Sequence, residues 1–252
     1  MAPWPVFVAA GAAVGLLTGF FGVGGSSIAT PLLSLLGVPG LLAIASPLPA
    51  TIPSALAAAI PYIRNRTARP KAAAWSLVGG IPATVAGALL SRVVGGPKLL
   101  VASGVALVII GLRVVRPIKE ASRRAGATRR KNRPLLMAAS AGVGLFTGLL
   151  ANGGGFLLVP MYLLVFGLDM GEAAGTSLLV IAVLSAPTMA THWALGHIDW
   201  TVAGAFALGA VPASAISGRL AQHVAGSAVR EAFGWFLVAS GAVFVIYRLA
   251  AG

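Results

Sequence analysis

The sequence has little charge, few acidic residues and no cysteine. Only 9% of its 252 residues are charged, whereas a soluble domain carries about 25%. Because 58% of the residues are hydrophobic, the others are too few to cover a water-exposed surface. The composition therefore excludes a soluble globular domain and predicts an integral membrane protein. Without cysteine, disulfides, thiolate metal sites and cysteine nucleophiles are excluded as well.

Motifs for catalysis or metal binding are also absent from the sequence. It contains no metal-ligand spacing, nucleophile elbow or P-loop lysine motif, so we expect no enzyme, no metal site and no cofactor. Asp169, Glu172, Asp199 and Glu231 lie in loops or at the ends of apolar runs. Because no carboxylate is placed for a proton relay in mid-membrane, an anion there would have to be held by backbone amides and hydroxyl groups.

The basic residues are concentrated in two linkers. Nine of the eighteen Lys and Arg residues lie between Arg113 and Arg133, and four more lie between Arg64 and Lys71. In a soluble protein the net charge of +13 would suggest a nucleic-acid partner. Here both stretches join apolar runs, which favours cytoplasmic loops that face anionic lipids and predicts no nucleic-acid binding.

A glycine-rich pattern occurs twice in the chain. GLLTGFFGVGGSSIATP at 15–31 recurs as GLFTGLLANGGGFLLVP at 144–160, offset by 129 residues, and seven of the seventeen aligned positions are identical. A later set of four residues recurs at an offset of 130, namely Gly79, Pro82, Ala83 and Leu90 with Gly209, Pro212, Ala213 and Leu220. The sequence therefore predicts an internal repeat that covers each half of the chain.

The apolar runs divide the chain into a first membrane repeat at 1–116, a basic linker at 117–134 and a second membrane repeat at 135–252. Each repeat has a broken apolar element followed by three runs of about 20 residues, the length of a membrane-spanning helix. In order, these are 4–21 with 27–37, 43–63, 72–93 and 97–116, then 135–167, 173–195, 200–220 and 231–249. We expect an all-α fold in which prolines distort the run at 43–63.

The basic loops also predict the orientation. The loops at 64–71 and 117–133 are separated by two crossings, so they face one side, which the positive-inside rule makes cytoplasmic. If each broken element is a re-entrant hairpin, each half has three full crossings and the repeats are inverted. Both termini are then on the outer side of the membrane. The first residues lack a basic n-region, so we expect a retained membrane segment and not a signal peptide.

Helix breaks within a membrane are candidate anion sites, because the N-H groups at the start of the second half-helix have no partner in hydrocarbon. The breaks fall at Gly24, Gly25 and Ser26 in the first copy and at Asn152, Gly153, Gly154 and Gly155 in the second. Hydroxyl groups near them that could also bind an anion are Thr18, Thr147, Ser46, Thr51, Thr176 and Ser177. Ser46 and Thr176 are the stronger candidates, because they correspond at an offset of 130.

His192 is the one histidine inside an apolar run, near its outer end. Two interpretations remain open: a packed, hydrogen-bonded interface residue, or a proton-linked gate, because an imidazole titrates near physiological pH. Its counterpart in the first half is Tyr62.

These motifs give the chain a resemblance to a known family. The stretches TGFFGVGGSSIATPLL, TGLLANGGGFLLVPMYL and AAGTSLLV, with the basic central linker, resemble the TauE/SafE sulfite exporter family over nearly the full length. The resemblance implies a two-repeat helical transporter that moves sulfite, sulfoacetate or a related sulfur-containing anion, with substrate bound at both glycine-rich breaks. The first copy departs from the family pattern, because Ser26-Ser27 replaces a third glycine and an aromatic or aliphatic residue.

Three functions are therefore open at this point. The first is a secondary transporter that exports a small sulfur oxyanion or organosulfonate by alternating access. The second is an uptake permease for an anion or carboxylate. The third is a membrane assembly partner that does not transport.

Overall fold

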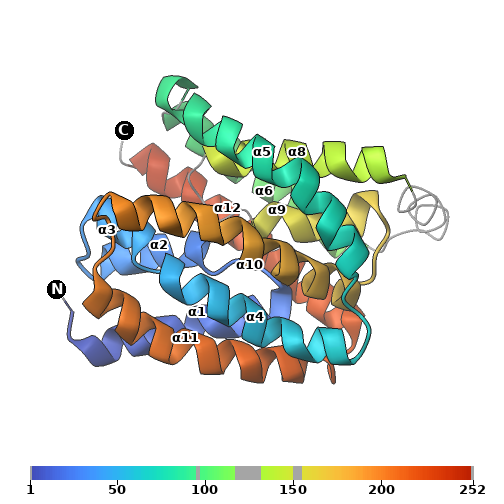
Figure 1. Ribbon diagram of the computed structural model, residues 1–252, viewed down its shortest axis with the longest axis horizontal. Helices are drawn as coiled ribbons and strands as arrows, with labels where there is room; N and C mark the ends of the chain where they lie inside the picture. The colour runs from blue at the N-terminus through green and yellow to red at the C-terminus, as the bar shows by residue number, and fades with distance from the viewer. Residues whose placement is uncertain (1, 95–96, 117–131, 150–154, 251–252) are drawn as a thin grey trace.

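The computed structural model describes residues 2–94, 97–116, 132–149 and 155–250, and these form helices joined by short turns (Figure 1). The helices of the first half are α1 (Trp4–Phe21), α2 (Ser26–Leu35), α3 (Gly40–Ala45), α4 (Leu48–Arg64), α5 (Pro70–Val94) and α6 (Pro97–Val115). Those of the second are α8 (Arg133–Leu149), α9 (Gly155–Pro160) with a π-helical turn η1 (Met161–Val165), α10 (Met170–Ala194), α11 (Trp200–Ala221) and α12 (Gly226–Ala250).

The prediction of an all-α membrane fold is confirmed. Among the described residues, four stretches are long and apolar enough to cross a membrane: Trp4–Phe21, Leu41–Arg64, Met170–Ala194 and Trp200–Ala221. Large apolar side chains such as Leu208 (68% exposed) and Ile216 (54%) lie on the outer face of α11. Soluble monomers rarely expose contiguous apolar surface of this kind, so this face fits a lipid environment.

The run at 43–63 is interrupted where its prolines begin. α3 ends at Ala45, and α4 starts at Leu48 after Pro47. A proline lacks the N-H that would continue the helical hydrogen bonding, so the expected distortion is confirmed as a break between two helices.

The two halves interlock through equivalent helices. α1 packs along α11, and α5 packs along α8, on opposite sides of the molecule (Figure 1). The first helix of each half thus lies against the second-last helix of the other. α6 also packs along α12, which places the last helices of the two halves together. Neither half contains all the packing partners that its own helices need.

Glycines allow the paired helices to approach closely at matching positions. A Cβ added at Gly209 of α11 would overlap the carbonyl oxygen of Val8 in α1, and one added at Gly79 of α5 would overlap that of Met137 in α8. Gly79 and Gly209 correspond at the offset of 130, and Val8 and Met137 at 129. Small residues at such crossings bring the backbones into contact, which stabilises helix association in lipid.

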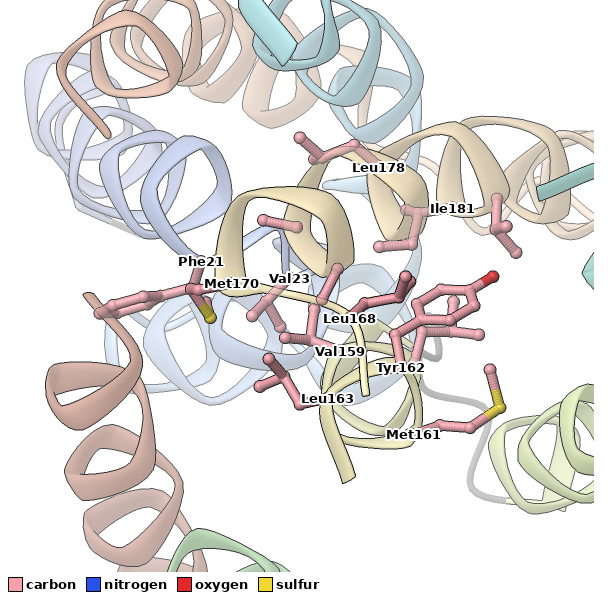
Figure 2. Close-up of a cluster of buried hydrophobic side chains, with 14 of the residues drawn as sticks. Phe21, Val23, Val159, Met161, Tyr162, Leu163, Leu168, Met170, Leu178 and Ile181 are labelled. Atoms are coloured by element: carbon pink, nitrogen blue, oxygen red, sulfur yellow. The ribbon is translucent and has the colours of Figure 1, made fainter. Parts of the chain in front are cut away.

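The largest buried apolar cluster joins the two broken elements. Phe21 at the end of α1 and Val23 in the break after it lie in one cluster with Val159 and Leu163 of the second broken element. Figure 2 shows these side chains together with Met170 and Leu178 of α10. Because Val23 and Val159 are completely buried, the polypeptide around the first break is covered by protein and not by lipid.

The chain ends and the basic turns lie at opposite ends of the bundle. In Figure 1 the start of α1 and the end of α12 are at the left, whereas the turn between α4 and α5 and the start of α8 are at the right. Trp4, Trp193 and Trp200 are more than half exposed, and Trp4 and Trp200 begin the helices whose first residues lie at the left.

Candidate functional site

The predicted break in the first half is present and buried. α1 ends at Gly22, whose φ of 69° lies in the left-handed region that glycine adopts without strain. Its N-H donates to the Thr18 carbonyl, which closes the helix. α2 then begins, and the N-H groups of Ile28 and Ala29 donate to the Gly25 carbonyl. Gly24 and Gly25 are both buried between the two helices.

Hydroxyl groups from three other helices bind the carbonyl groups near the end of α1. Ser217 of α11 donates to the Gly15 carbonyl (3.2 Å), Tyr62 of α4 to the Gly19 carbonyl (2.8 Å), and Ser177 of α10 to the Gly22 carbonyl. The last carbonyls of a helix lack intrahelical partners, and hydrocarbon offers none. The Gly15 carbonyl, one turn earlier, keeps its helical partner, so the Tyr62 and Ser177 hydroxyls are the two that make a buried helix end possible, and Ser217 adds a further contact that holds α1 in place.

A small cavity, lined mostly by apolar groups with three hydroxyl side chains among them, lies beside the start of α2. Its volume is about 10 Å³, close to the minimum that admits one water molecule. Residues from α1, α4 and α11 line it together with Gly25, namely Val14, Thr18, Ala50, Thr51, Ser54, Phe206 and Ala210. The Ser54 side chain is 4% exposed, and its hydroxyl has no hydrogen-bond partner in the described part of the chain.

The cavity lies near the middle of the helices that line it. Ser54 is the seventh of the seventeen residues of α4, and Ala210 is the eleventh of the twenty-two of α11. A helix of about 20 residues spans the hydrocarbon core. Because Gly25 lines the same cavity, the start of α2 lies at mid-height of the bundle.

Thr18, Thr51 and Thr147, three of the predicted hydroxyl residues, bond to their own helices. The Thr18 hydroxyl donates to the Val14 carbonyl (2.9 Å) and the Thr51 hydroxyl to the Pro47 carbonyl (3.1 Å). In the second half, Thr147 donates to the Gly144 carbonyl (2.9 Å). Helical threonines commonly make this bond, and their oxygen lone pairs stay free to accept another. The hydroxyl hydrogens of Thr18 and Thr51, which both line the cavity, are therefore already used within their own helices.

Ser46 and Thr176 form a matched pair of contacts between the halves. The Ser46 hydroxyl accepts the N-H of Asp199 just before α11 (3.1 Å), and the Thr176 hydroxyl accepts the N-H of Arg69 just before α5 (3.0 Å). Asp199 and Arg69 themselves correspond at the offset of 130. Both hydroxyls thus cap the start of a helix in the opposite half. Their contact with substrate stays a prediction.

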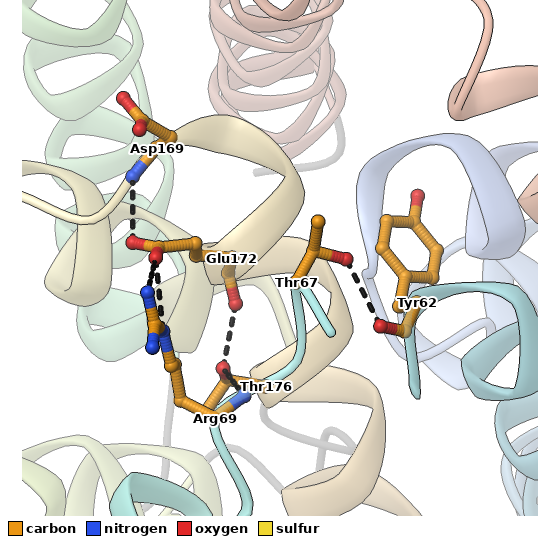
Figure 3. Close-up of polar contacts among 6 residues, drawn as sticks. All are labelled: Tyr62, Thr67, Arg69, Asp169, Glu172 and Thr176. Carbon is orange, nitrogen blue, oxygen red and sulfur yellow. Dashed lines mark hydrogen bonds and ion pairs between the residues drawn. The ribbon is translucent and has the colours of Figure 1, made fainter. Parts of the chain in front are cut away.

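An ion pair links the halves at the end that carries the basic turns. Figure 3 shows the Arg69 guanidinium against the Glu172 carboxylate, with the Nε to Oε1 distance at 2.9 Å. The Thr176 hydroxyl beside them donates to the Glu172 carbonyl (2.6 Å). Because the Arg69 side chain is about half exposed, solvent screens the pair, and its contribution to stability is modest.

The second glycine-rich break lies largely outside the described residues. Asn152, Gly153 and Gly154 fall there, whereas Gly155 begins α9 and Ser26 begins α2. Substrate contacts at these positions, and an approach of the two breaks to one another, stay predictions.

His192, in the last turn of α10, pairs with His197 in the connection between α10 and α11. Its Nδ1 lies 3.3 Å from Nδ1 of His197, and the rings are tilted at 54°. The ring does not line the cavity beside α2. Its counterpart Tyr62 binds the Gly19 carbonyl and is completely buried, so the structure gives the two residues different partners.

Ser54 is the residue that the sequence reasoning missed. It is one of several serines in apolar runs, and its neighbours carry no motif. One signal was available: Thr51 and Ser54 are three residues apart and so share one face of a helix, as a hydroxyl pair would in a polar site.

The spanning helices, the apolar outer surface and the buried break together define a multi-pass membrane protein. A family model described as sulfite exporter TauE/SafE matches residues 7–244, so the chain belongs to this family, as the resemblance predicted. Because it belongs to this family, the protein is a membrane transporter.

Similar proteins are described as probable membrane transporters. A probable membrane transporter protein of Xylella fastidiosa strain Temecula1 is 27% identical over 255 residues, which cover 96% of this chain and 95% of that one. The probable membrane transporter protein YunE of Bacillus subtilis strain 168 is 26% identical over 242 residues, which cover 87% of each chain. No solved structure matches the chain significantly.

Proposed function

We propose that the protein exports a small sulfur-containing anion, such as sulfite, sulfoacetate or a related organosulfonate, across the bacterial inner membrane by alternating access. The observation that carries the proposal is the buried start of α2 at mid-height, beside a cavity that contains the unpaired Ser54 hydroxyl. The positive end of a helix dipole and its free N-H groups bind anions. The family description adds the class of substrate.

An inverted arrangement of the two halves is part of the proposal. α6 and α12, the last helices of the halves, run antiparallel: Gly111 faces Val238, whereas Val115 faces Gly234. Counterparts related by a twofold axis in the membrane plane run in opposite directions, and inverted repeats of this kind hold substrate near the midplane. The exchanged pairs α1 with α11 and α5 with α8 also fit such an axis.

The orientation proposed for the membrane places the basic turns in the cytoplasm and both termini outside. The positive-inside rule supports this choice, and so do exposed tryptophans at the end opposite the basic turns, because tryptophan accumulates at membrane interfaces. A negative cell interior would then drive an anion outward without a coupled ion.

Proteoliposomes test the proposed function. We expect purified wild-type protein to release trapped sulfite or sulfoacetate when the interior is made negative, and Asn152→Ala or Gly154→Leu to abolish this flux while the protein still elutes as a folded species. Gly142→Ala is the matched control, because a Cβ added there meets nothing within 4 Å. Full flux through Asn152→Ala would contradict the assignment of that residue. Absence of flux for every anion tested would favour an assembly partner, and inward-only flux an uptake permease.

If the anion moves without a coupled proton, replacing His192 should have a specific result. We expect His192→Gln to transport with the same pH profile as wild type between about pH 5 and 8, the range in which an imidazole titrates. The physical reason is that the histidine pair lies at the end of α10 and does not line the cavity. The measurement is initial flux at fixed membrane potential across this range, with His223→Gln as the control. A profile flattened in His192→Gln alone would establish proton linkage instead.

A further inference from the structure

We infer that the cavity at Ser54 is the subsite for one oxygen atom of the transported anion, and that substrate binding is concentrated at the break in the first half. The inference rests on the proposed function and adds a residue, Ser54, and an asymmetry between the two breaks. A cavity of about 10 Å³ admits one oxygen-sized group. The rest of a sulfite or sulfonate would lie outside it, along the break.

The donors around the cavity fit an anionic oxygen. Ser54 is buried, its hydroxyl has no hydrogen-bond partner among the described residues, and an unpaired buried hydroxyl is costly in a folded protein. The first intrahelical donors of α2 are the N-H groups of Ile28 and Ala29, and N-H groups that precede the first donors of a helix have no intrahelical acceptor. An oxygen of an anion accepts bonds from both kinds of donor, which a neutral apolar group cannot do.

The matching positions of the second half do not reproduce this set. Thr51 and Ser54 of α4 correspond to Ile181 and Leu184 of α10 at the offset of 130. Ile181 is completely buried in the main apolar cluster, and Leu184 packs against that cluster. The hydroxyl of Ser76, which corresponds to Phe206, is already bonded to the Tyr162 hydroxyl (2.6 Å). The described positions that correspond to Thr51, Ser54 and Phe206 thus offer no unpaired hydroxyl to a ligand.

The hydroxyl groups that hold the end of α1 also have no equivalents at the corresponding positions of the repeat. Tyr62 and Ser177 bind carbonyls at the end of α1, but their counterparts are His192 and Pro47, which do not provide equivalent hydroxyls. A binding subsite needs groups held in fixed positions, and the first break has them. The first half therefore provides the built part of the substrate site.

Ser54→Ala tests the inference through two measurements of opposite sign. We expect it to weaken sulfite binding to the purified protein about tenfold or more, the effect of losing a hydrogen bond to a charged group. We expect the same change to raise the Tm of the ligand-free protein by about 2 to 4 °C, because it removes a buried polar group without a partner. A hydroxyl with a structural role would instead lower the Tm when removed.

Ser185→Ala is the matched control, since Ser185 is also a serine 4% exposed and lies on the corresponding helix α10. It should leave sulfite affinity unchanged. Wild-type sulfite affinity in Ser54→Ala would overturn the inference, whatever the Tm, and would leave the proposed export intact. Equal losses of sulfite affinity in Ser54→Ala and Ser185→Ala would have the same meaning. A lower Tm in ligand-free Ser54→Ala would also overturn it. Absence of both binding and flux for sulfite and sulfoacetate in wild type would refute the proposed function itself.

Discussion

Gly209→Ala is expected to lower the Tm by about 6 to 12 °C, the result of overpacking by about 3 kcal/mol in a chain of this size. The added methyl group would overlap the Val8 carbonyl oxygen, which belongs to the backbone and cannot rotate away. α1 and α11 would have to separate along their length to make room. Gly79→Ala should have a similar effect on α5 and α8, because its Cβ would overlap the Met137 carbonyl oxygen.

Gly204→Ala provides the control within the same helix, because a Cβ at Gly204 meets nothing within 4 Å. Alanine favours a helix over glycine by about 1 kcal/mol, so this change should leave the Tm equal or higher. Thermal unfolding in detergent, followed by circular dichroism, measures both variants. If Gly209→Ala were as stable as Gly204→Ala, the two helices would have to be farther apart than the structure places them.

The double variant Tyr62→Phe with Ser177→Ala is expected to abolish flux and to destabilise the protein by about 2 to 5 kcal/mol. Each hydroxyl binds a carbonyl at the buried end of α1, so each deletion leaves one carbonyl oxygen without its partner. Where hydrocarbon or packed protein surrounds that group, the cost of an unsatisfied carbonyl is not offset by water. The end of α1 would then shift to find other partners and displace the start of α2.

Thr84→Val controls for the loss of a hydroxyl as such. The Thr84 hydroxyl donates to the Gly80 carbonyl (2.8 Å) inside α5, where that carbonyl keeps its ordinary helical partner. We expect little change in Tm or flux from this variant. The single variants should each retain part of the flux, and measured additivity of their unfolding free energies would show whether the two carbonyls are held independently. Full flux in the double variant would contradict a positioning role for these hydroxyls.

The sequence predicted the helices well because their signal is local. Runs of about 20 apolar residues end at glycine, proline or charged residues, and the bounds of α5 at 70–94 and α11 at 200–221 lie within a few residues of the predicted 72–93 and 200–220. The break near Gly24 was predicted for the same reason, since glycine clusters interrupt a helix wherever they occur. Packing between the halves has no local signal, so the pairing of α1 with α11 could not be predicted.

The candidate site shows the same limit. The correspondence of Ser46 with Thr176 was visible in the sequence, and the structure gives both residues one shared role as caps of a helix in the other half. A repeat indicates that two residues have the same role, but it does not show whether that role is to bind substrate or to cap a helix. Ser54 breaks the repeat, because its counterpart is Leu184, and its importance depends on which groups surround it.

The pairing of α1 with α11 has a consequence for biosynthesis. About 180 residues separate the end of α1 from the start of α11, so at about 5 to 20 residues per second the ribosome needs roughly 10 to 40 s to supply the partner. During that interval the glycine face of α1, with Gly11, Gly15 and Gly19, is inserted but not yet covered by α11. The nascent first half must therefore wait in the bilayer, or against an insertion factor, before its final contacts can form.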